Sequence, residues 1–227
     1  MASARRPELV IFDCDGVLVD SEPLSVRVLV ATMRDLGLSM TEADCYEHFL
    51  GRSLSSLKAT LRDNYKKTLT DHQLAIMRER LYDLYRAELK PIPGIAQTLE
   101  DLKLPYCVAS SSQPDRIRLS LELTGLIGYF GNRVFSSTMV EHGKPAPDLF
   151  LHAASAMGAA PEGCIVIEDS PAGFEAARRA SMRAFAFVGG SHAGPAGLSK
   201  TIAQMQPSII FEHMEMLPAL IGALAQG

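Results

Sequence analysis

A chain of 227 residues, of which 47% are hydrophobic and 21% are charged, has the composition of a globular protein with a buried core. At ~150 residues per domain, we expect one or two compact units. A formal net charge of −4 without a basic run argues against nucleic acid as a partner, and no apolar run reaches the ~20 residues that span a bilayer, so we expect no membrane partner.

The cysteines are spread along the chain without a close pair, at Cys14, Cys45, Cys107 and Cys164. Three of them lie in or against apolar runs, which predicts buried free thiols of a reducing compartment rather than a disulfide set or a zinc site. The apolar run at residues 9–12 is too short for a signal peptide. We therefore expect a cytoplasmic protein.

Short runs rich in Val, Ile and Phe predict strands at residues 9–12, 106–109, 133–135, 164–167, 184–188 and 208–211. These runs do not alternate with polar residues, which is typical of strands buried on both faces of a parallel sheet. Helical patterns follow most of them, at residues 115–123, 147–157, 172–180 and 216–225. The alternation indicates an α/β fold with a doubly wound parallel sheet, and the Gly-rich stretch 189–197 is expected to be a surface loop.

One long segment, from Ser21 to about Lys90, contains helical patterns and no convincing strand. Leu54, Leu57 and Leu61 share a helix face there, and prolines with a glycine at residues 91–94 mark the return to the sheet. We therefore predict an all-helical domain at residues 21–90, inserted into an α/β core domain formed by residues 1–20 and 91–227.

Two carboxylates, Asp13 and Asp15, follow the first predicted strand. Open α/β sheets bind their ligands at the carboxyl ends of their strands. Like charges this close are unfavourable unless they share a cation or a proton, and Mg²⁺ takes carboxylate and phosphate oxygens. An acidic turn that caps the next helix would explain Asp20 and Ser21, but it explains poorly why Asp13 ends an apolar strand.

Hydroxyl groups, a lysine and further acids lie near the ends of other predicted elements. Ser110 and Ser111 follow the second strand, where hydroxyls and free amides can hold a phosphate. Lys144 precedes the next predicted helix, and Glu168 and Asp169 end the fourth strand. Serine-rich turns and single loop lysines are common without a function. The informative feature is that two strand ends deliver acids to one edge.

In this order, the segments resemble the four signature motifs of the haloacid dehalogenase-like superfamily: Asp13-x-Asp15-Gly16, Ser110, Lys144-Pro145-x-Pro147-Asp148 and Glu168-Asp169-Ser170. Residues 17–22, the helical insertion and Gly173 resemble, more narrowly, the phosphoglucomutase-like phosphatases with a helical cap. The resemblance covers essentially the whole chain. It implies a Mg²⁺-dependent phosphatase that hydrolyses small phosphorylated metabolites such as sugar or polyol phosphates.

The resemblance also implies a role for each core residue. Asp13 is the nucleophile that forms an aspartyl phosphate, and Asp15 is the general acid and then the base. Ser110 and Lys144 hold the transferring phosphoryl group, whose charge must be neutralised, and Ser111 is expected to bind substrate beside them. The implied magnesium ligands are the Asp13 carboxylate, the Asp15 backbone carbonyl, Asp169 and, directly or through water, Glu168.

Other functions are weaker interpretations of the same residues. Dehalogenases of this superfamily usually lack the second acid, Asp15, and no phosphate-binding loop of a kinase or GTPase is present. Sugar-phosphate mutases generally carry a histidine in a Glu-Pro-x-His-like context, whereas Ser25 stands there in this chain, which favours hydrolysis. A non-catalytic phosphate-binding protein on this fold is the third alternative.

Substrate choice is expected to lie in the helical cap. Gly51, Arg52 and Ser53 resemble the loop that such caps lower onto the core site, and we expect them to bind substrate. A solvated arginine at a helix start is an equally supported interpretation of Arg52. The expected partner is a small phosphorylated molecule, and the chain is expected to be a monomer or a weak homodimer.

Overall fold

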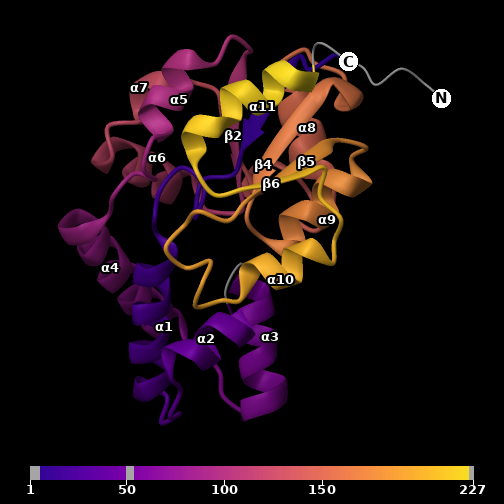
Figure 1. Cartoon of the computed structure of the whole chain (residues 1–227). Coiled ribbons are helices and arrows are strands. Elements are labelled where there is room, and N and C mark those ends of the chain that lie inside the picture. Colours follow the sequence, from indigo (N-terminus) through magenta and orange to yellow (C-terminus); the bar gives the residue numbers. More distant parts are fainter. Residues whose placement is uncertain (1–5, 50–53, 225–227) are drawn as a thin grey trace.

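The computed structural model describes residues 6–49 and 54–224 and contains a six-stranded parallel sheet with the order β3-β2-β1-β4-β5-β6 (Figure 1). The strands are β1 (Leu9–Phe12), β2 (Tyr106–Ser110), β3 (Val134–Ser136), β4 (Cys164–Glu168), β5 (Arg183–Phe187) and β6 (Ile209–Phe211). The chain winds outward from β1 in both directions, so the order reverses beside β1. This topology confirms the predicted doubly wound, Rossmann-like α/β fold, whose ligands bind at such a switch point.

The side chains of β1 explain why its sequence lacks alternation. Leu9 and Ile11 pack into one apolar cluster, and Val10 and Phe12 pack into another on the opposite face of the sheet. All four are at most 1% exposed. Both faces of the central strand are therefore covered, as the continuous apolar run predicts.

Helices form a layer on each side of the sheet. One face is covered by α5 (Ile95–Asp101), α6 (Pro114–Leu123), α7 (Ile127–Phe130) and α11 (Leu217–Leu224). The other face is covered by α8 (Asp148–Ala156) and α9 (Pro171–Arg179), and α10 (Leu198–Ala203) packs near β5 through Ile202. Single 3₁₀ turns occur at Ser137–Met139, Pro161–Gly163 and Met214–Met216.

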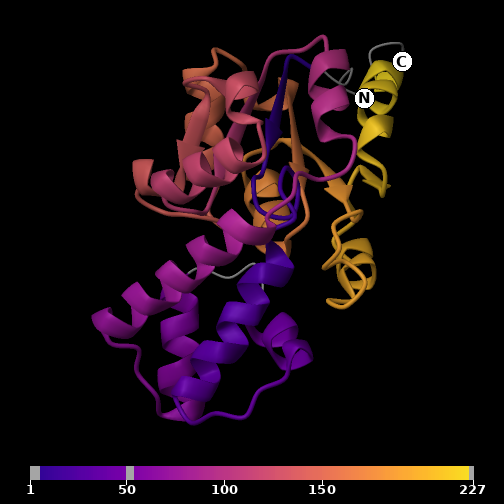
Figure 2. The same ribbon diagram turned by 90° about the vertical axis from the view of Figure 1, so that its left-hand side faces the viewer.

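Four helices follow β1 and lie beyond the carboxyl ends of the strands (Figure 2): α1 (Glu22–Asp35), α2 (Glu42–Phe49), α3 (Leu54–Tyr65) and α4 (Asp71–Glu88). They bury an apolar cluster of their own, which includes Val26, Met33 and Leu61. Thr70 begins α4 with a reciprocal capping box with Gln73, so this helix start is fixed locally.

The chain enters and leaves these helices through two adjacent segments. The Asp20 N–H donates to the Lys90 carbonyl oxygen at 2.9 Å, and the Ile92 N–H donates to the Leu18 carbonyl oxygen at 2.9 Å. Val19 and Pro91 form an antiparallel bridge between these two hydrogen bonds. The two connections between the sheet and α1–α4 are therefore held together as a short ribbon.

Some local predictions change. The helices α5, α7 and α10 were not predicted, because at 7, 4 and 6 residues they are too short to establish a periodicity. The Gly-rich stretch 189–197 is a loop but not simply a surface one, since Gly190, His192 and Ala193 are buried. All four cysteines are buried and free, as predicted. Within residues 6–49 and 54–224, no helix has the length and apolar character that crossing a bilayer requires.

Candidate functional site

The carboxyl end of β1 delivers Asp13 to the centre of the sheet edge. Its backbone N–H donates to the Ile167 carbonyl oxygen at 3.0 Å, which extends the pairing of β1 with β4. Burial raises the pKa of Asp13 well above its ordinary value, and the Lys144 ammonium opposes this shift. A carboxylate at this place therefore depends on nearby positive charge.

Lys144 supplies that charge. Its Nζ donates to Asp13 Oδ1 at 2.5 Å, to Glu168 Oε1 at 2.6 Å and to the Ala109 carbonyl oxygen at 3.0 Å, so the donors of the ammonium are all used. The ammonium also lies 4.7 Å from the centre of the Phe150 ring. Burial lowers the pKa of Lys144, but the neighbouring Asp13 and Glu168 raise it by more than burial lowers it. The pKa therefore lies above its ordinary value, and the group stays charged.

Glu168 ends β4, and hydrogen bonds occupy both of its oxygens. Oε1 faces Lys144, while Oε2 accepts from the backbone N–H of Asp169 at 3.1 Å and from the N–H and hydroxyl of Ser170 at 3.0 and 2.9 Å. A Cβ on Gly173 would lie 1.8 Å from Oε1. The start of α9 can therefore approach Glu168 only because residue 173 is glycine.

The three acids from β1 and β4 meet in one place. Asp13, Glu168 and Asp169 can each present an oxygen within 4.8 Å of the others, and all three residues are buried. Burial raises the pKa of Asp169, which the neighbouring His192 counteracts. When all three are ionised, these buried acids carry more negative charge than Lys144 can balance. Their oxygens fit a hard divalent cation, which takes oxygen ligands.

Asp15, two residues after Asp13, lies in a separate network. Its Oδ1 accepts from the Ser21 hydroxyl at 2.7 Å and from Arg116 Nη2 at 2.9 Å, and its Oδ2 accepts from the Ser112 hydroxyl at 2.6 Å. Burial raises the pKa of Asp15, but the Arg116 charge and the hydroxyl donors outweigh it, so the pKa lies below its ordinary value. This environment favours the ionised form of Asp15, the form that would act as the base in the predicted acid–base role.

Arg116 connects this network to the helices beyond the sheet. Besides Asp15, its Nη2 reaches the Ser25 hydroxyl on α1 at 3.4 Å, and its guanidinium carbon lies 5.5 Å from the centre of the Tyr85 ring on α4. The Tyr85 hydroxyl and Arg116 Nε are buried without a hydrogen-bond partner. One side chain of α6 therefore touches Asp15 and two helices of the α1–α4 group.

The predicted serines lie at the end of β2. Ser110 is buried, its hydroxyl accepts from the Ser112 N–H at 3.1 Å, and it follows the Ala109 carbonyl that Lys144 contacts. Ser111 is exposed on the same turn, at the same edge. The predicted core residues are thus brought together. Gly51, Arg52 and Ser53 lie outside the described residues.

Sequence reasoning missed two residues of this edge, Arg116 and His192. Arg116 stands in the first turn of α6, where the helix dipole disfavours a cation, so its position carried a signal that another interaction holds it there. His192 follows Gly189 and Gly190 in a loop without a motif. The paired glycines, which leave space for a neighbouring ring, were the available signal for His192.

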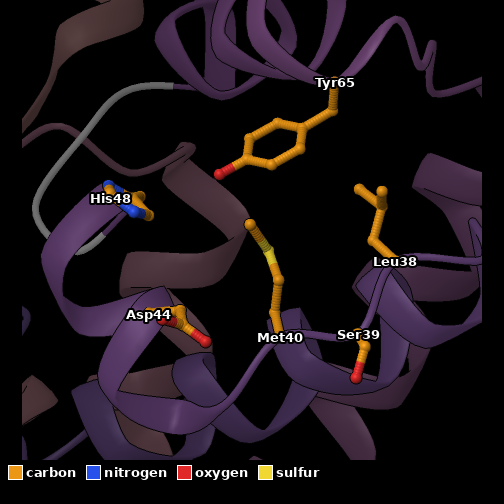
Figure 3. A pocket seen from close by; sticks show the side chains of 6 residues that line it. All are labelled: Leu38, Ser39, Met40, Asp44, His48 and Tyr65. Carbon is orange, nitrogen blue, oxygen red and sulfur yellow. The ribbon is translucent and has the colours of Figure 1, made fainter.

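A separate pocket of about 200 Å³ lies between the segment that joins α1 to α2, the helix α2 and the end of α3 (Figure 3). Its lining residues are Leu38, Ser39, Met40, Asp44, His48 and Tyr65. The side chains of Tyr65 and Met40 point toward each other across it (Figure 3). The Asp44 carboxylate is engaged by the N–H and hydroxyl of Thr41, each at 2.7 Å, so it serves the start of α2. None of the residues predicted to be catalytic lines this pocket.

Comparison with known proteins identifies the family of the chain. The sequence model of the haloacid dehalogenase-like hydrolases matches residues 7–181. The 6-phosphogluconate phosphatase of Escherichia coli is 30% identical over 216 residues, which cover 95% of each chain.

Two solved structures share the whole architecture. A conserved haloacid dehalogenase-like protein of Agrobacterium tumefaciens has a TM-score of 0.84 and 30% identity, covering 96% of this chain and 99% of its own. A hydrolase of the same family from Deinococcus radiodurans, with bound phosphate and sodium, has a TM-score of 0.78 and 27% identity, covering 96% of each chain.

Proposed function

The chain belongs to the haloacid dehalogenase-like hydrolases and is a phosphatase of that family, and we propose that it hydrolyses small sugar or polyol phosphates through an aspartyl phosphate on Asp13. The observation that carries this proposal is the Lys144 ammonium, held between Asp13 and Glu168 in a buried acidic site. The phosphatase relative from E. coli, whose name specifies a sugar-acid phosphate, supports the substrate class.

We assign the nucleophilic step to Asp13. Its carboxylate oxygen forms a bond to phosphorus while the bond to the leaving oxygen breaks, so a difficult hydrolysis is divided into two easier displacements. Ser110 and Lys144 would hold the phosphoryl oxygens, with a phosphoryl oxygen replacing one of the three present acceptors of the Lys144 ammonium, and Ser111 lies beside them. Lys144 is already fixed by Asp13 and Glu168, so little reorganisation is needed when charge develops on the phosphoryl group.

We assign a Mg²⁺ site to Asp13, Asp169 and the Asp15 carbonyl, because the buried acids fit an ion that prefers oxygen ligands. Bound there, the ion would neutralise charge on the phosphoryl oxygens. Both oxygens of Glu168 already accept hydrogen bonds, which favours its contribution through water rather than by direct contact.

We assign proton transfer to Asp15. A proton on Asp15 would pass to the leaving oxygen in the first step, and the resulting carboxylate would take a proton from water in the second, a role worth ~10²–10⁴-fold in rate. In the present arrangement Ser21, Ser112 and Arg116 stabilise the carboxylate. Loosening of the contact with Arg116 would make protonation of Asp15 easier.

The helices α1–α4 form, in this proposal, a cap domain of residues 21–90 that closes over the edge. Closure would exclude water and bring Gly51, Arg52 and Ser53 toward the part of the substrate that does not react. We expect this movement to begin at the short ribbon that joins Leu18–Asp20 to Lys90–Ile92.

A sugar-phosphate mutase is the second candidate, and one observation weighs against it. Ser25, which takes the place of the mutase histidine, lies beside Arg116 near Asp15 and offers only a hydroxyl. A non-catalytic phosphate-binding protein is disfavoured because each catalytic position carries a residue able to act. Phosphorus NMR separates these outcomes: inorganic phosphate indicates hydrolysis, an isomeric sugar phosphate indicates a mutase, and no product indicates binding alone.

The proposal is tested by measuring phosphate release across sugar, sugar-acid and polyol phosphates with Mg²⁺. We expect turnover of several of these esters, its loss in a chelator and its return with Mg²⁺, with Ca²⁺ poorer because its longer and looser coordination disturbs the in-line geometry. Full activity in the chelator would exclude the metal assignment. Absence of phosphate release from every ester would exclude the proposed substrate class.

A further inference from the structure

The loop between β5 and α10 places a histidine against the acidic site. His192 is 1% exposed, and its Nε2 lies 2.9 Å from Asp169 Oδ2. Of the side chains that the structure describes, His192 alone is hydrogen-bonded to the Asp169 carboxylate. The orientation of this acid therefore depends on a residue from a distant loop.

Two glycines make room for the His192 ring. A Cβ on Gly16 would lie 1.9 Å from Asp169 Oδ2 and 2.9 Å from His192 Cε1, and Gly16 has a φ of +79° that favours glycine. A Cβ on Gly190 would lie 2.6 Å from His192 Cε1. The contact between His192 and Asp169 thus exists only because both surrounding segments lack a side chain at these positions.

The same loop is fixed to the chain that follows Asp13 and Asp15. The Ser191 N–H and hydroxyl donate to Asp20 Oδ1 at 3.2 and 2.8 Å. Residue 192 is therefore held from its neighbour as well as through its own ring, which limits the freedom of the imidazole.

The surroundings of the second ring nitrogen argue against a purely space-filling role for His192. His192 Nδ1 is buried without a hydrogen-bond partner. With or without a proton, an unpaired ring nitrogen is unfavourable in the interior. A purely space-filling role would be served better by an apolar side chain, so the contact from Nε2 to Asp169 is the interaction that explains a histidine here.

We propose that His192 is a positioning residue that orients the Asp169 carboxylate for metal binding. Donation from Nε2 holds Oδ2 and leaves the other oxygen of Asp169 without a side-chain donor, available to an ion. Groups that hydrogen-bond to metal ligands in this way typically change metal affinity 10–100-fold when they are removed. This inference rests on the metal site of the proposed function.

The test compares two variants by Mg²⁺ binding, measured by calorimetry without substrate. His192→Leu removes the donor and keeps an apolar volume, and we expect its Kd for Mg²⁺ to rise about 10-fold or more. His192→Gln keeps an amide donor, and we expect it to bind within a few-fold of the wild type. Raising Mg²⁺ should restore most of the turnover of His192→Leu. His152→Leu on α8, remote in sequence and exposed, is the matched control and should bind Mg²⁺ as the wild type does.

The melting temperature without metal distinguishes positioning from a structural role. We expect the metal-free variants to melt like the metal-free wild type, with the difference between Leu and Gln confined to the shift that Mg²⁺ produces. Wild-type affinity in His192→Leu would overturn the proposal while leaving the phosphatase intact. Equal loss of affinity in both variants would also overturn it. A wild-type protein that binds no Mg²⁺ would overturn this inference and the metal assignment together.

Discussion

The sheet edge and the helices α1–α4 differ in the burial of their ion pairs. At the edge, Lys144 pairs with Asp13 and Glu168, and the exposed fractions of these side chains are 3%, 11% and 0%. On the helices, Arg27 pairs with Glu88 at 2.5 Å, but these side chains are 44% and 45% exposed. Similar distances thus occur in very different environments.

The difference matters because burial of charge is costly. The attraction within a buried pair often fails to offset the lost hydration, and removing one partner is strongly destabilising, whereas an exposed pair contributes ~0–1 kcal/mol. The edge therefore keeps an arrangement that stability alone does not favour, while the exposed pair on α1–α4 contributes little to stability. We expect changes at the edge to affect every substrate alike, and changes in the α1–α4 segment to affect substrates selectively.

The largest effect should follow loss of the nucleophile. Asp13→Asn should reduce phosphate release below detection for every ester, because an amide oxygen does not attack phosphorus as a carboxylate does. The circular dichroism spectrum should stay that of the wild type. Asp101→Asn, an exposed acid at the end of α5, is the matched control and should keep full activity. Substantial turnover by Asp13→Asn would contradict the covalent mechanism.

Arg116 contacts both the sheet edge and the helices α1–α4, so its substitution tests the connection between these two regions. Arg116→Met should lower the free energy of unfolding by about 1.5–3 kcal/mol, the scale of a hydrogen bond between charged groups, because Asp15 loses its cation. Denaturant unfolding measures the change. Arg118→Met on the same helix, whose side chain is 71% exposed, should change little. Equal small losses in both variants would mean that the pair with Asp15 contributes nothing to stability.

A selective effect is expected from the segment outside the described residues. Arg52→Ala should lower kcat/KM on the preferred metabolite by ~10-fold or more, since a guanidinium can hold a carboxylate or hydroxyl-rich end of the substrate. The small ester p-nitrophenyl phosphate, which has no such end, should be affected little. Equal losses on both esters would assign Arg52 to the chemistry or the fold, and no loss on either would make it a solvated surface residue.

The smallest effect should come from the exposed ion pair. Arg27→Met should change the free energy of unfolding by less than ~1 kcal/mol, because water already solvates both charges and little is gained by pairing them. Thermal and denaturant unfolding check this, with phosphate release expected to stay at the wild-type level. A loss comparable with that of Arg116→Met would remove the contrast between the two regions.

The sequence was most informative where strand ends bring groups together. Asp13, Glu168 and Asp169 could be placed at one edge because parallel strands end on the same side, and continuous apolar runs identify such strands. The role of Lys144 came from the resemblance of its motif to the family. The doubly wound topology followed from the alternation of strands and helices. These inferences depend on local pattern and on rules of connection, both of which a sequence contains.

The contacts made by Arg116 and His192 depend instead on how elements pack. Arg116 reaches Asp15 across about a hundred residues of chain, and His192 reaches Asp169 from a Gly-rich stretch that was predicted to be a surface loop. The lowered pKa of Asp15 likewise depends on the charge of Arg116, which no adjacent residue indicates. Neither packing nor this charge is encoded in a motif of adjacent residues.

The ribbon formed by Leu18–Asp20 and Lys90–Ile92 has an evolutionary consequence. Two hydrogen bonds between 18–20 and 90–92 hold the points where the chain departs from the sheet and rejoins it side by side. A segment inserted between adjacent points can be lengthened, shortened or exchanged without displacing the strand before it. A junction of this kind permits exchange of the helices between its two ends while the edge of the sheet keeps its geometry.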